Sequence, residues 1–572
     1  MLKRFTAVIL SLAMTAFLAS CAGGNQSGNG TTDLSGSAET TAAAAGTQEE
    51  YFADGDYKDV TGETPNAEIT LSGGEGTISD TTRGSSGATV TITSKGIYRV
   101  TGESENVTIL VNDETESGNI YLVLDGVTMT NDASPCILVE KADKVILQTV
   151  GETALTCTVA DDSAAEDGAV YAKDDLTING SGALTVNSSL HGVVCKDDLR
   201  LTGGKISITA ENIGLKSGGS VRVGGGEITV SAGHDGVQAT NNDGTGYFHI
   251  ADGVLTVDAG YDGICADTGF SSQDGEISIT AGGGSDNAKD SDISQKGIKC
   301  MELAVSGGAI TVSSADDAIH CENAAVSGGS LTLSSSDDGI HANSALAISG
   351  GDVSVTKSYE GIEAQTIAVA GGNISVYAGD DGVNAAGGSD SASTEDTPWS
   401  AESSASGSFT VSGGTIYVNA NGDGLDSNGS LIISGGTVIV EGPTDNGNGA
   451  LDKGDGSGCV AQITGGTVLA LGSAGMAVNF DSGSQCSALV AISVSAGDTV
   501  SVDDGSGFTF TATKSFSCAV YSSPSLRQGE SYTLTAGSGS ATMDFSSGLY
   551  YSDVGGMGAP GMGGMGVPGG RG

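Results

Sequence analysis

Short runs in which apolar and polar residues alternate recur along most of the chain at a nearly fixed spacing. Three neighbouring stretches, 298–318, 319–339 and 340–361, each contain three such runs separated by turns. Ile310 and Val312 lie in one run with polar residues between and beside them, and the next two stretches repeat this pattern. Period-2 alternation is typical of half-buried β-strands. We therefore expect each stretch to form three short strands.

The spacing of these runs defines a repeat. Residues 169–476 divide into about twelve units, most of them about 21 or 22 residues long. Glycine pairs such as Gly307-Gly308 and Gly350-Gly351 recur at one turn of the unit, where a tight bend favours positive φ. One unit cannot bury its own apolar face, but units stacked about 4.8 Å apart enclose a continuous core. The sequence therefore predicts an all-β fold, a right-handed parallel β-helix with three-sided coils.

The segments outside the regular repeat differ in character. Residues 51–168 keep the strand alternation but lose the strict register, so we expect N-terminal coils and a cap. The spacing fails again after residue 476, and residues 477–554 are predicted to form a C-terminal β cap. Residues 555–572 are rich in Gly, Met and Pro and are predicted to be disordered. Insertions at 282–292 and 387–407 interrupt the repeat.

The N-terminus has the features of a bacterial export signal. Lys3 and Arg4 precede an apolar stretch, 5–18, that is too short to span a bilayer comfortably. The stretch ends in Leu-Ala-Ser-Cys, which matches the lipobox of bacterial lipoproteins and predicts lipidation of Cys21 after removal of residues 1–20. An ordinary signal peptide with an unrelated cysteine is the alternative. Residues 21–50 are predicted to be a flexible tether, so we expect a lipid-anchored protein of the cell envelope, exposed outside the cytoplasm at the cell surface.

The charge of the chain restricts its partners. The net charge of −48 excludes nucleic acid, because no basic surface is available to neutralise phosphates. The lipid anchor is the only contact with a membrane that the sequence predicts. Beyond Cys21 the cysteines are scattered and odd in number, which argues against a disulfide framework.

Acidic residues recur at the corner that closes each unit. When aligned by the repeat, they should lie on consecutive coils about 5 Å apart, where two unit charges repel by about 3 kcal/mol at an effective dielectric near 20. Calcium relieves such repulsion because it accepts six to eight oxygen ligands in irregular arrangements. The alternative is that Asp-Gly corners are simply solvated turns. The predicted calcium ligands are Asp235, Asp262, Asp316, Asp317, Asp337, Asp338, Glu360, Asp380, Asp381, Asp423 and Asp426.

A second column of polar residues lies three positions beyond the corners. These side chains should project outward and offer a binding face for an extended polymer, to which aromatic rings add apolar surfaces that stack on sugars. His320 and His341 fall in this column, but the column offers no further His or Cys ligand, so zinc is the weaker interpretation there. The predicted ligand-binding residues are Lys299, His320, His341, Glu363, Asn384 and Trp399.

Several stretches resemble a known family. They are GKISITAENIGLKSGG (204–219), SQKGIKC (294–300), DDGIHA (337–342) and GDDGVNAAGG (379–388). These stretches resemble bacterial carbohydrate-binding β-helix proteins, whose architecture is related to that of polysaccharide lyases. The resemblance extends over roughly residues 60–550. It implies a calcium-containing protein that binds cellulose or acidic polysaccharides such as polygalacturonate.

Two other functions stay open. A calcium-dependent polysaccharide lyase needs a basic residue beside the metal to remove a proton, and Lys299 is the best candidate for that base. The absence of arginine from 298–424 argues against a lyase, because substrate clamps are missing. A structural adhesin with protein partners is the third possibility. We expect a calcium-dependent polysaccharide-binding protein without catalytic residues.

Overall fold

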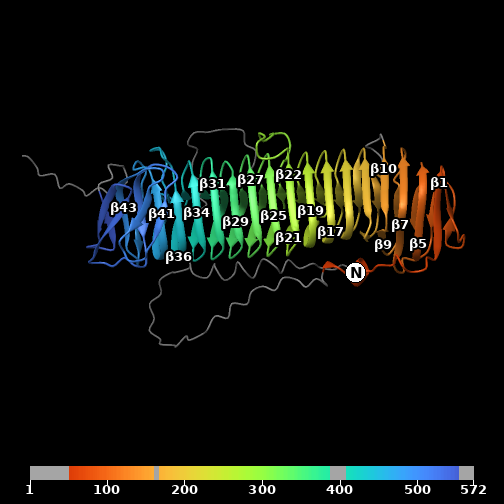
Figure 1. Cartoon of the computed structure of the whole chain (residues 1–572), viewed down its shortest axis with the longest axis horizontal. Helices are drawn as coiled ribbons and strands as arrows, with labels where there is room; N and C mark the ends of the chain where they lie inside the picture. Colours follow the sequence, from red (N-terminus) through yellow and green to blue (C-terminus); the bar gives the residue numbers. More distant parts are fainter. Residues whose placement is uncertain (1–50, 160–165, 387–406, 553–572) are drawn as a thin grey trace, which may run out of the picture.

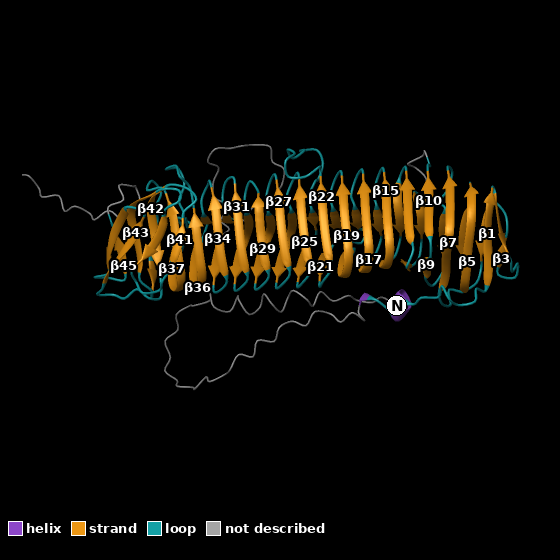
Figure 2. Cartoon of the chain, viewed as in Figure 1, coloured by secondary structure: helices purple, strands orange, loops and turns teal. Residues whose placement is uncertain are grey.

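The computed structural model describes residues 51–159, 166–386 and 407–552. Strands make up 58% of the structure, which confirms the predicted all-β class. Helix in the described ranges amounts to one turn, α3 (Asp54–Tyr57). None of the helical structure in these ranges is long and apolar enough to cross a membrane. The strands lie side by side in sequence order along the long axis of the molecule (Figures 1 and 2).

Consecutive repeat units pair through parallel strands. Ile310 of β25 (Ala309–Ser314) is the register partner of Leu331 in β27 (Ser330–Ser335). Leu331 is in turn the partner of Val353 in β29 (Asp352–Lys357). All three side chains point inward and are at most 1% exposed. The apolar positions of the alternating pattern therefore form a continuous interior.

The repeat arranges its strands in three rows. The first row, which carries the acidic corners, comprises β8 (Ile137–Lys141), β11 (Gly168–Ala172), β14 (His191–Cys195), β16 (Leu215–Ser217), β18 (Val237–Ala239), β20 (Ile264–Ala266), β23 (Ile298–Lys299), β26 (Ile319–Val326), β28 (Ile340–Ile348), β30 (Ile362–Val369), β32 (Val383–Ala385) and β35 (Leu425–Ser427). The second row comprises β9 (Val145–Thr149), β12 (Leu176–Gly180), β15 (Leu199–Ala210), β17 (Ser220–Ala232), β19 (Tyr247–Ala259), β21 (Gly269–Ser272), β24 (Glu302–Val305), the second halves of β26, β28 and β30, β33 (Ser408–Val411), β36 (Ser430–Glu441) and β37 (Ala461–Gly472). The third row comprises β10 (Glu152–Cys157), β13 (Ala183–Ser188), the second halves of β15, β17 and β19, β22 (Glu276–Ala281), β25, β27, β29, β31 (Asn373–Ala378), β34 (Thr415–Ala420) and the second halves of β36 and β37.

The two ends of the stack contain antiparallel pairs. At the N-terminal end lie β1 (Ala67–Gly73), β2 (Glu75–Ile78), β3 (Gly84–Ser85), β4 (Thr89–Ile92), β5 (Gly96–Glu105), β6 (Thr108–Asn112) and β7 (Ile120–Asn131). At the C-terminal end, β38 (Ser482–Gly483), β39 (Ser487–Val494), β42 (Phe516–Ser522) and β45 (Leu549–Tyr551) continue the large sheet. A separate four-stranded sheet contains β40 (Thr499–Val502), β41 (Thr509–Thr511), β43 (Ser531–Ala536) and β44 (Gly539–Asp544). In this region β42 pairs antiparallel with both β37 and β39.

The glycine pairs allow the turns of neighbouring units to stack closely. Gly329 has φ +79°, and a Cβ atom there would lie 2.9 Å from the backbone of Gly307. Such contacts repeat along the stack, so a larger residue would push the coils apart. The cysteines in the described ranges are free thiols, and Cys300 and Cys321 are buried core residues.

Residues 51–61 form a strap that lies against the outer face of the second row. Asp56 is fully buried there and forms an ion pair with Lys144 at 2.8 Å, while Thr177 donates a hydrogen bond to its carboxylate at 2.7 Å. At one end of the strap, the ring of Tyr51 stacks on that of His249 at 3.6 Å. The strap therefore fixes the start of the described chain to the side of the stack.

Candidate functional site

The parallel register places the acidic corners in one line. Val237, Ile264, Ile298 and their counterparts on later strands are consecutive register partners, and each follows its corner residue by two positions. We call this line the corner column: Asp235, Asp262, Lys296, Asp317, Asp338, Glu360, Asp381 and Asp423. The residues three positions further on are also register partners and form the outer column: Gln238, Cys265, Lys299, His320, His341, Glu363, Asn384 and Asp426.

One oxygen of several corner carboxylates holds the next unit in place. The Oδ1 atom of Asp381 accepts a hydrogen bond from the main-chain N–H of Asp423 at 2.6 Å. The same contact joins Asp235 to Asp262 at 3.2 Å, Asp262 to Lys296 at 2.9 Å and Asp317 to Asp338 at 3.2 Å. The corner carboxylates are therefore part of the structure that stacks the units, in addition to any role in binding.

The second oxygen faces the outer column. Gln238 Nε2 donates to Asp235 Oδ2 at 2.8 Å. His320 Nδ1 and His341 Nδ1 lie 2.8 Å from Oδ2 of Asp317 and of Asp338, respectively. In these units the outer residue supplies a donor for the carboxylate.

Lysine ammonium groups occupy the middle of the corner column. Lys296 Nζ lies 2.6 Å from Asp317 Oδ2 and 3.1 Å from Asp316 Oδ1. Lys289, from the insertion at 282–292, reaches Asp316 Oδ1 at 2.9 Å and Asp337 Oδ2 at 2.7 Å. Asp316, Asp317 and Asp337 bring oxygens within 4.8 Å of one another, a suitable spacing for an ion. An ion here would have to displace an ammonium group that the chain itself provides.

In the described part of the chain, no lysine or arginine forms an ion pair with the carboxylates at the C-terminal part of the column, although Lys453 partly offsets the rise in the pKa of Asp452 that burial causes. Burial and then neighbouring carboxylates, including Asp381 and Asp452, raise the pKa of Asp423 to about 6 and that of Asp426 to about 7. The bridge between Leu425 and Leu451 places Asp452 beside Asp426. We call Asp381, Asp423, Asp426 and Asp452 the C-terminal acidic group.

The donors of this group are carboxylate oxygens, the ligand type that hard cations take. The partner of Asp423 in the outer column is Asp426, which can donate a hydrogen bond only when protonated. Lys453 follows Asp452 directly, but its ammonium lies 3.7 Å from Asp481. Burial and mutual repulsion favour a proton or a cation at these carboxylates, and a set of oxygen donors is the kind that calcium takes.

The outer column differs in accessibility from residue to residue. The Lys299 side chain is 42% exposed and lies 3.7 Å from Asp262 Oδ2. His341 is only 2% exposed, so it offers little surface to a sugar. Glu363 and Asn384 are half-buried. Trp399, like Cys21, lies outside the described residues.

An exposed aromatic ring stands beside the corner column at Glu360. Tyr359 directly precedes Glu360 and is 52% exposed. Its hydroxyl forms a hydrogen bond with Asp380, which raises the pKa of Tyr359 to about 12. Tyr377 is also exposed, but it lies on β31 in the third row, where its ring packs edge-on against Tyr417. The ring of Tyr359 therefore offers the flat apolar surface next to the acidic groups.

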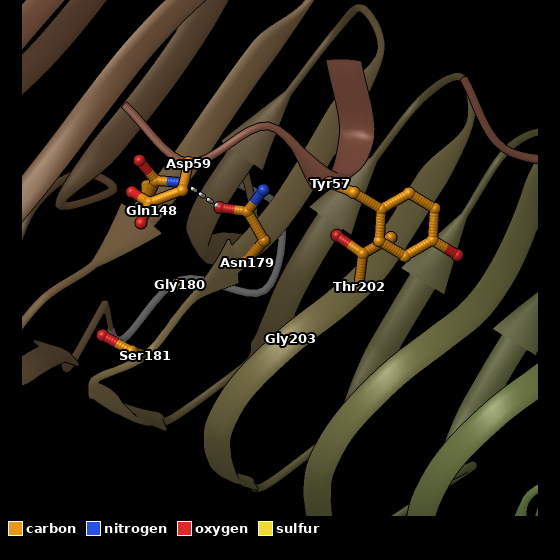
Figure 3. Close-up of a pocket in the computed structure, with 8 residues that line it drawn as sticks. All are labelled: Tyr57, Asp59, Gln148, Asn179, Gly180, Ser181, Thr202 and Gly203. Carbon is orange, nitrogen blue, oxygen red and sulfur yellow. Dashed lines mark hydrogen bonds between the residues drawn. The ribbon is translucent and has the colours of Figure 1, made fainter. Parts of the chain in front are cut away.

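A small pocket between the strap and the second row has a structural role (Figure 3). Gln148 Nε2 donates to Lys58 O at 3.0 Å and to Asn179 Oδ1 at 2.9 Å, while its Oε1 accepts from Val60 N. Asn179 Nδ2 donates to Asp56 O at 2.8 Å. Both donor hydrogens of Gln148 are therefore used to hold the strap rather than a ligand.

Two residues of the site escaped the sequence-based prediction. Asp452 belongs beside Asp426, and the repeated Leu-Asp of 425–426 and 451–452 is the signal that identifies it. Lys289 lies in an irregular insertion, where no spacing rule connects it with Asp316 or Asp337.

These features define an all-β protein of stacked units with a line of ionisable side chains along one row. Residues 86–339 match the family of carbohydrate-binding domain-containing proteins, which confirms the expected resemblance for that part of the chain. A carbohydrate-binding domain-containing protein of Acetivibrio thermocellus is 36% identical over 129 residues, which are 21% of this chain and 45% of that protein. This chain thus spans less than half the length of that relative.

A solved structure is also similar. It is described as the polysaccharide lyase-like protein from C. thermocellum, gadolinium derivative, and is 31% identical. The match covers 42% of this chain and 96% of that chain, with a TM-score of 0.37. The family match ends at Gly339, so the C-terminal acidic group lies beyond it.

Proposed function

We propose that this protein is a cell-surface lipoprotein that binds an extended, acidic or cellulose-like plant polysaccharide in a calcium-dependent manner, without catalysis. The observation that carries the carbohydrate part is the match of residues 86–339 to a carbohydrate-binding family. The strong negative charge supports a requirement for cations, because an acidic glycan would otherwise be repelled.

We also infer that the stacked units form a right-handed parallel β-helix. The parallel register between consecutive units, as in Ile310–Leu331–Val353, supports this interpretation. A three-sided stack presents long, flat rows, and such rows fit a polymer that extends over several units. A binding site of this kind requires no deep cavity.

The C-terminal acidic group is the calcium site in this proposal. Its carboxylates carry raised pKa values, and an ion placed among them would neutralise their repulsion and draw them together. Several other predicted calcium ligands already have a positively charged or hydrogen-bonding partner in the ion-free protein, so they have less need of an ion. Asp316, Asp317 and Asp337 are already paired with lysines, and Asp235 has Gln238 as its donor.

The glycan would lie over the adjoining surface. Tyr359 provides a ring for stacking on a sugar, and a calcium ion at the neighbouring carboxylates can bridge to a uronate carboxylate. Lys299 provides a cation further along the same row. Anchoring through Cys21 would hold this body at the membrane surface by its lipid alone.

Retention of the protein on insoluble polysaccharides tests the proposal. We expect the full chain to be retained on calcium-loaded polygalacturonate or cellulose and released by EDTA. Tyr359→Ala should weaken retention without changing calcium affinity, whereas Asp426→Asn should weaken both. Tyr57→Ala, which removes an exposed ring of the strap on the second row, is the matched control. Binding that survives EDTA would contradict the calcium requirement, and no retention on any glycan would favour an adhesin with protein partners.

The lyase remains the second candidate because of one contact. Lys299 Nζ lies 3.7 Å from Asp262, so a base stands beside a carboxylate that can hold calcium. Polygalacturonate incubated with protein and calcium would then yield unsaturated products that absorb ultraviolet light. If product forms with wild type and is lost in Lys299→Met, the protein is a lyase that cleaves the glycan by elimination and does more than bind it.

A further inference from the structure

His320 and His341 occupy successive positions of the outer column. They are register partners on β26 and β28, and their rings stack at 4.8 Å with an interplanar angle of 14°. The Nδ1 atom of each ring faces the corner carboxylate of its own unit. The surroundings of the two rings differ, because a carboxylate of the next unit also approaches His341.

That carboxylate belongs to Glu363 on β30. Glu363 Oε2 lies 3.2 Å from His341 Nδ1, while Asp338 Oδ2 lies 2.8 Å from the same nitrogen. The three potential ligand atoms all lie within 4.8 Å of one another, and His341 and Asp338 are buried. One imidazole nitrogen is therefore enclosed by carboxylates of two consecutive units.

The other ring nitrogen of His341 fixes the chemistry of Nδ1. His341 Nε2 lies 3.2 Å from Asn343 Oδ1, and the carbonyl oxygen can only accept, so Nε2 is the donor. Asn343 is held in this orientation because its Nδ2 donates to Glu322 Oε2 at 3.3 Å. Metal-ligating histidines commonly donate their second N–H in this way, which leaves the first nitrogen to bind the ion.

The distances also suit a small ion. Zinc binds histidine nitrogen and carboxylate oxygen at about 2.0–2.2 Å, so neighbouring ligand atoms of a tetrahedral site stand about 3.3 Å apart. The observed 2.8 and 3.2 Å separations require only a slight opening. In the ion-free protein His341 Nδ1 lies within hydrogen-bond distance of both carboxylates, so an ion would take the place of the proton that is donated there.

We propose that Asp338, His341 and Glu363 form a binding site for a divalent transition metal ion of the zinc class, distinct from the calcium site of the C-terminal acidic group. Imidazole and carboxylate together form a ligand set for zinc, cobalt or nickel, whereas calcium takes oxygen ligands. The ion replaces the proton on His341 Nδ1, which is released to solvent. Water fills the fourth position of the tetrahedron.

The site links the units that contribute its ligands. Asp338 and His341 belong to one unit and Glu363 to the next, so the ion would cross-link the stack at its centre. The sequence alone does not assemble this site, because its ligands come from two different columns. The inference does not depend on sugar binding or on calcium.

Titration of the full chain with zinc and with cobalt, in buffer containing excess calcium, tests the proposal. We expect one tight zinc site and, with cobalt, the intense visible absorption of a tetrahedral nitrogen and oxygen environment. His341→Gln should lower zinc affinity at least about a hundredfold, and Asn343→Ala about tenfold because it only orients the ring. Glutamine is a suitable replacement, since Gln238 already donates to the corner residue Asp235 in this chain.

His234→Gln serves as the matched control. His234 stacks on Tyr261 at 4.4 Å near the start of the corner column, so its loss should leave zinc affinity unchanged. Glu363→Gln, which keeps the side-chain size, gives a second test in case His341→Gln is unstable. Zinc affinity that is the same in wild type, His341→Gln and Glu363→Gln would overturn the proposal, as would the absence of tight zinc binding in wild type. Calcium-dependent glycan retention is measured separately, so its failure is distinguishable from the failure of this site.

Discussion

The side-chain carboxylate of Asp381 accepts the main-chain N–H of Asp423 at 2.6 Å, although the two residues are 42 positions apart in the chain. Asp423 itself accepts a hydrogen bond from the N–H of Gly449 in the next unit. Carboxylates that hold the units together are thus also the carboxylates that repel one another. The hydrogen bonds stabilise the stack, while the repulsion between the carboxylates destabilises it by an amount that depends on bound protons and ions.

Removal of calcium should expose that cost. The folded-state pKa of Asp426, about 7, lies above its unfolded value of 3.8, so the protonated form is favoured on folding. Stability from this group is therefore fully present below about pH 4 and is lost as the pH rises through about 7. In EDTA at pH 8, Asp426→Asn should be more stable than wild type, by about 2 kcal/mol. Denaturant unfolding measures the difference.

Added calcium should reverse the order of the two proteins. If calcium binds the C-terminal acidic group as proposed, it will stabilise the folded wild type, whereas Asp426→Asn will lack one ligand and respond less. Asp258→Asn removes an exposed carboxylate of β19 away from the column and should change neither value. An equal response of wild type and Asp426→Asn to calcium would show that the ion binds elsewhere.

Loss of Lys289 should destabilise the calcium-free protein, which is the opposite of the effect expected for Asp426→Asn. Its ammonium lies between Asp316 and Asp337, so Lys289→Gln leaves their repulsion uncompensated. We expect a loss of about 1 kcal/mol in EDTA, because the lysine is partly exposed and solvent screens the pair. Calcium should restore this loss and reveal one additional ion per chain in equilibrium dialysis.

Lys357→Gln is the control that distinguishes the effect of the Lys289 charge from the effect of a loosened 282–292 loop. Lys357 on β29 binds Asp286 Oδ1 of the same insertion at 2.7 Å, and within the described residues it forms no ion pair with the corner column. This variant should loosen the loop without creating a calcium site. An additional ion in Lys357→Gln but not in Lys289→Gln would contradict the role assigned to Lys289.

The sequence predicted the features that depend on a constant period. Ile310 and Val312 are buried as the alternation requires, because each strand has one inward face. From Lys296 to Asp381 the corner residues recur every 21 or 22 positions, so their register follows from counting. Outside this range the units are longer, and alignment of the turn motifs rather than counting places Asp262 and Asp423 in the column. The solvent accessibility of the outer-column side chains could not be predicted from the spacing of the units. His341 is buried because Glu363 and Asn343 lie against it, and that depends on side-chain packing between units.

Features that join distant or irregular segments could not be predicted. Lys289 acts from an insertion without a period. Asp56 forms its ion pair with Lys144, 88 residues away, and nothing in the pattern of 51–61 indicates that this segment lies along the second row. The lipobox at Cys21 and the insertion with Trp399 fall outside the described residues, and their roles stay predictions.

Substitution of Asp56 should release the strap. Asp56→Ala leaves Lys144 partly buried without its carboxylate, and loss of one partner of a buried pair costs about 3–5 kcal/mol. The strap should detach locally while the rest of the protein stays folded, because the strap packs on the stack from outside. We expect faster hydrogen exchange at Val60 N, which now donates to Gln148, and faster cleavage near residue 61.

Asp59→Asn is the matched control for the strap. The Asp59 side chain is exposed and accepts a hydrogen bond only within its own turn, from Thr61 N at 2.8 Å. Exchange at Val60 should therefore stay at the wild-type rate in Asp59→Asn. Slow exchange in Asp56→Ala would mean that the remaining contacts, including the hydrogen bonds of Gln148 and Asn179 to the strap backbone, hold the strap without the ion pair.

His249 should make the same segment sensitive to acid. Its imidazole is fully buried beneath Tyr51, and burial, followed by the charge of Arg222, lowers its pKa from 6.5 to about 3. The neutral form is therefore favoured on folding, so this contribution is fully present above about pH 6.5 and is lost as the pH falls toward 3. His249→Phe keeps an aromatic ring beneath Tyr51 but does not titrate. The free energy of unfolding of the wild type should therefore fall by up to about 4 kcal/mol more than that of His249→Phe between pH 7 and pH 3.5. The quantity to compare is the difference in free energy of unfolding between the two proteins, because the carboxylates that both proteins share contribute equally to each. Identical pH profiles would show that His249 gains a proton without opening the strap.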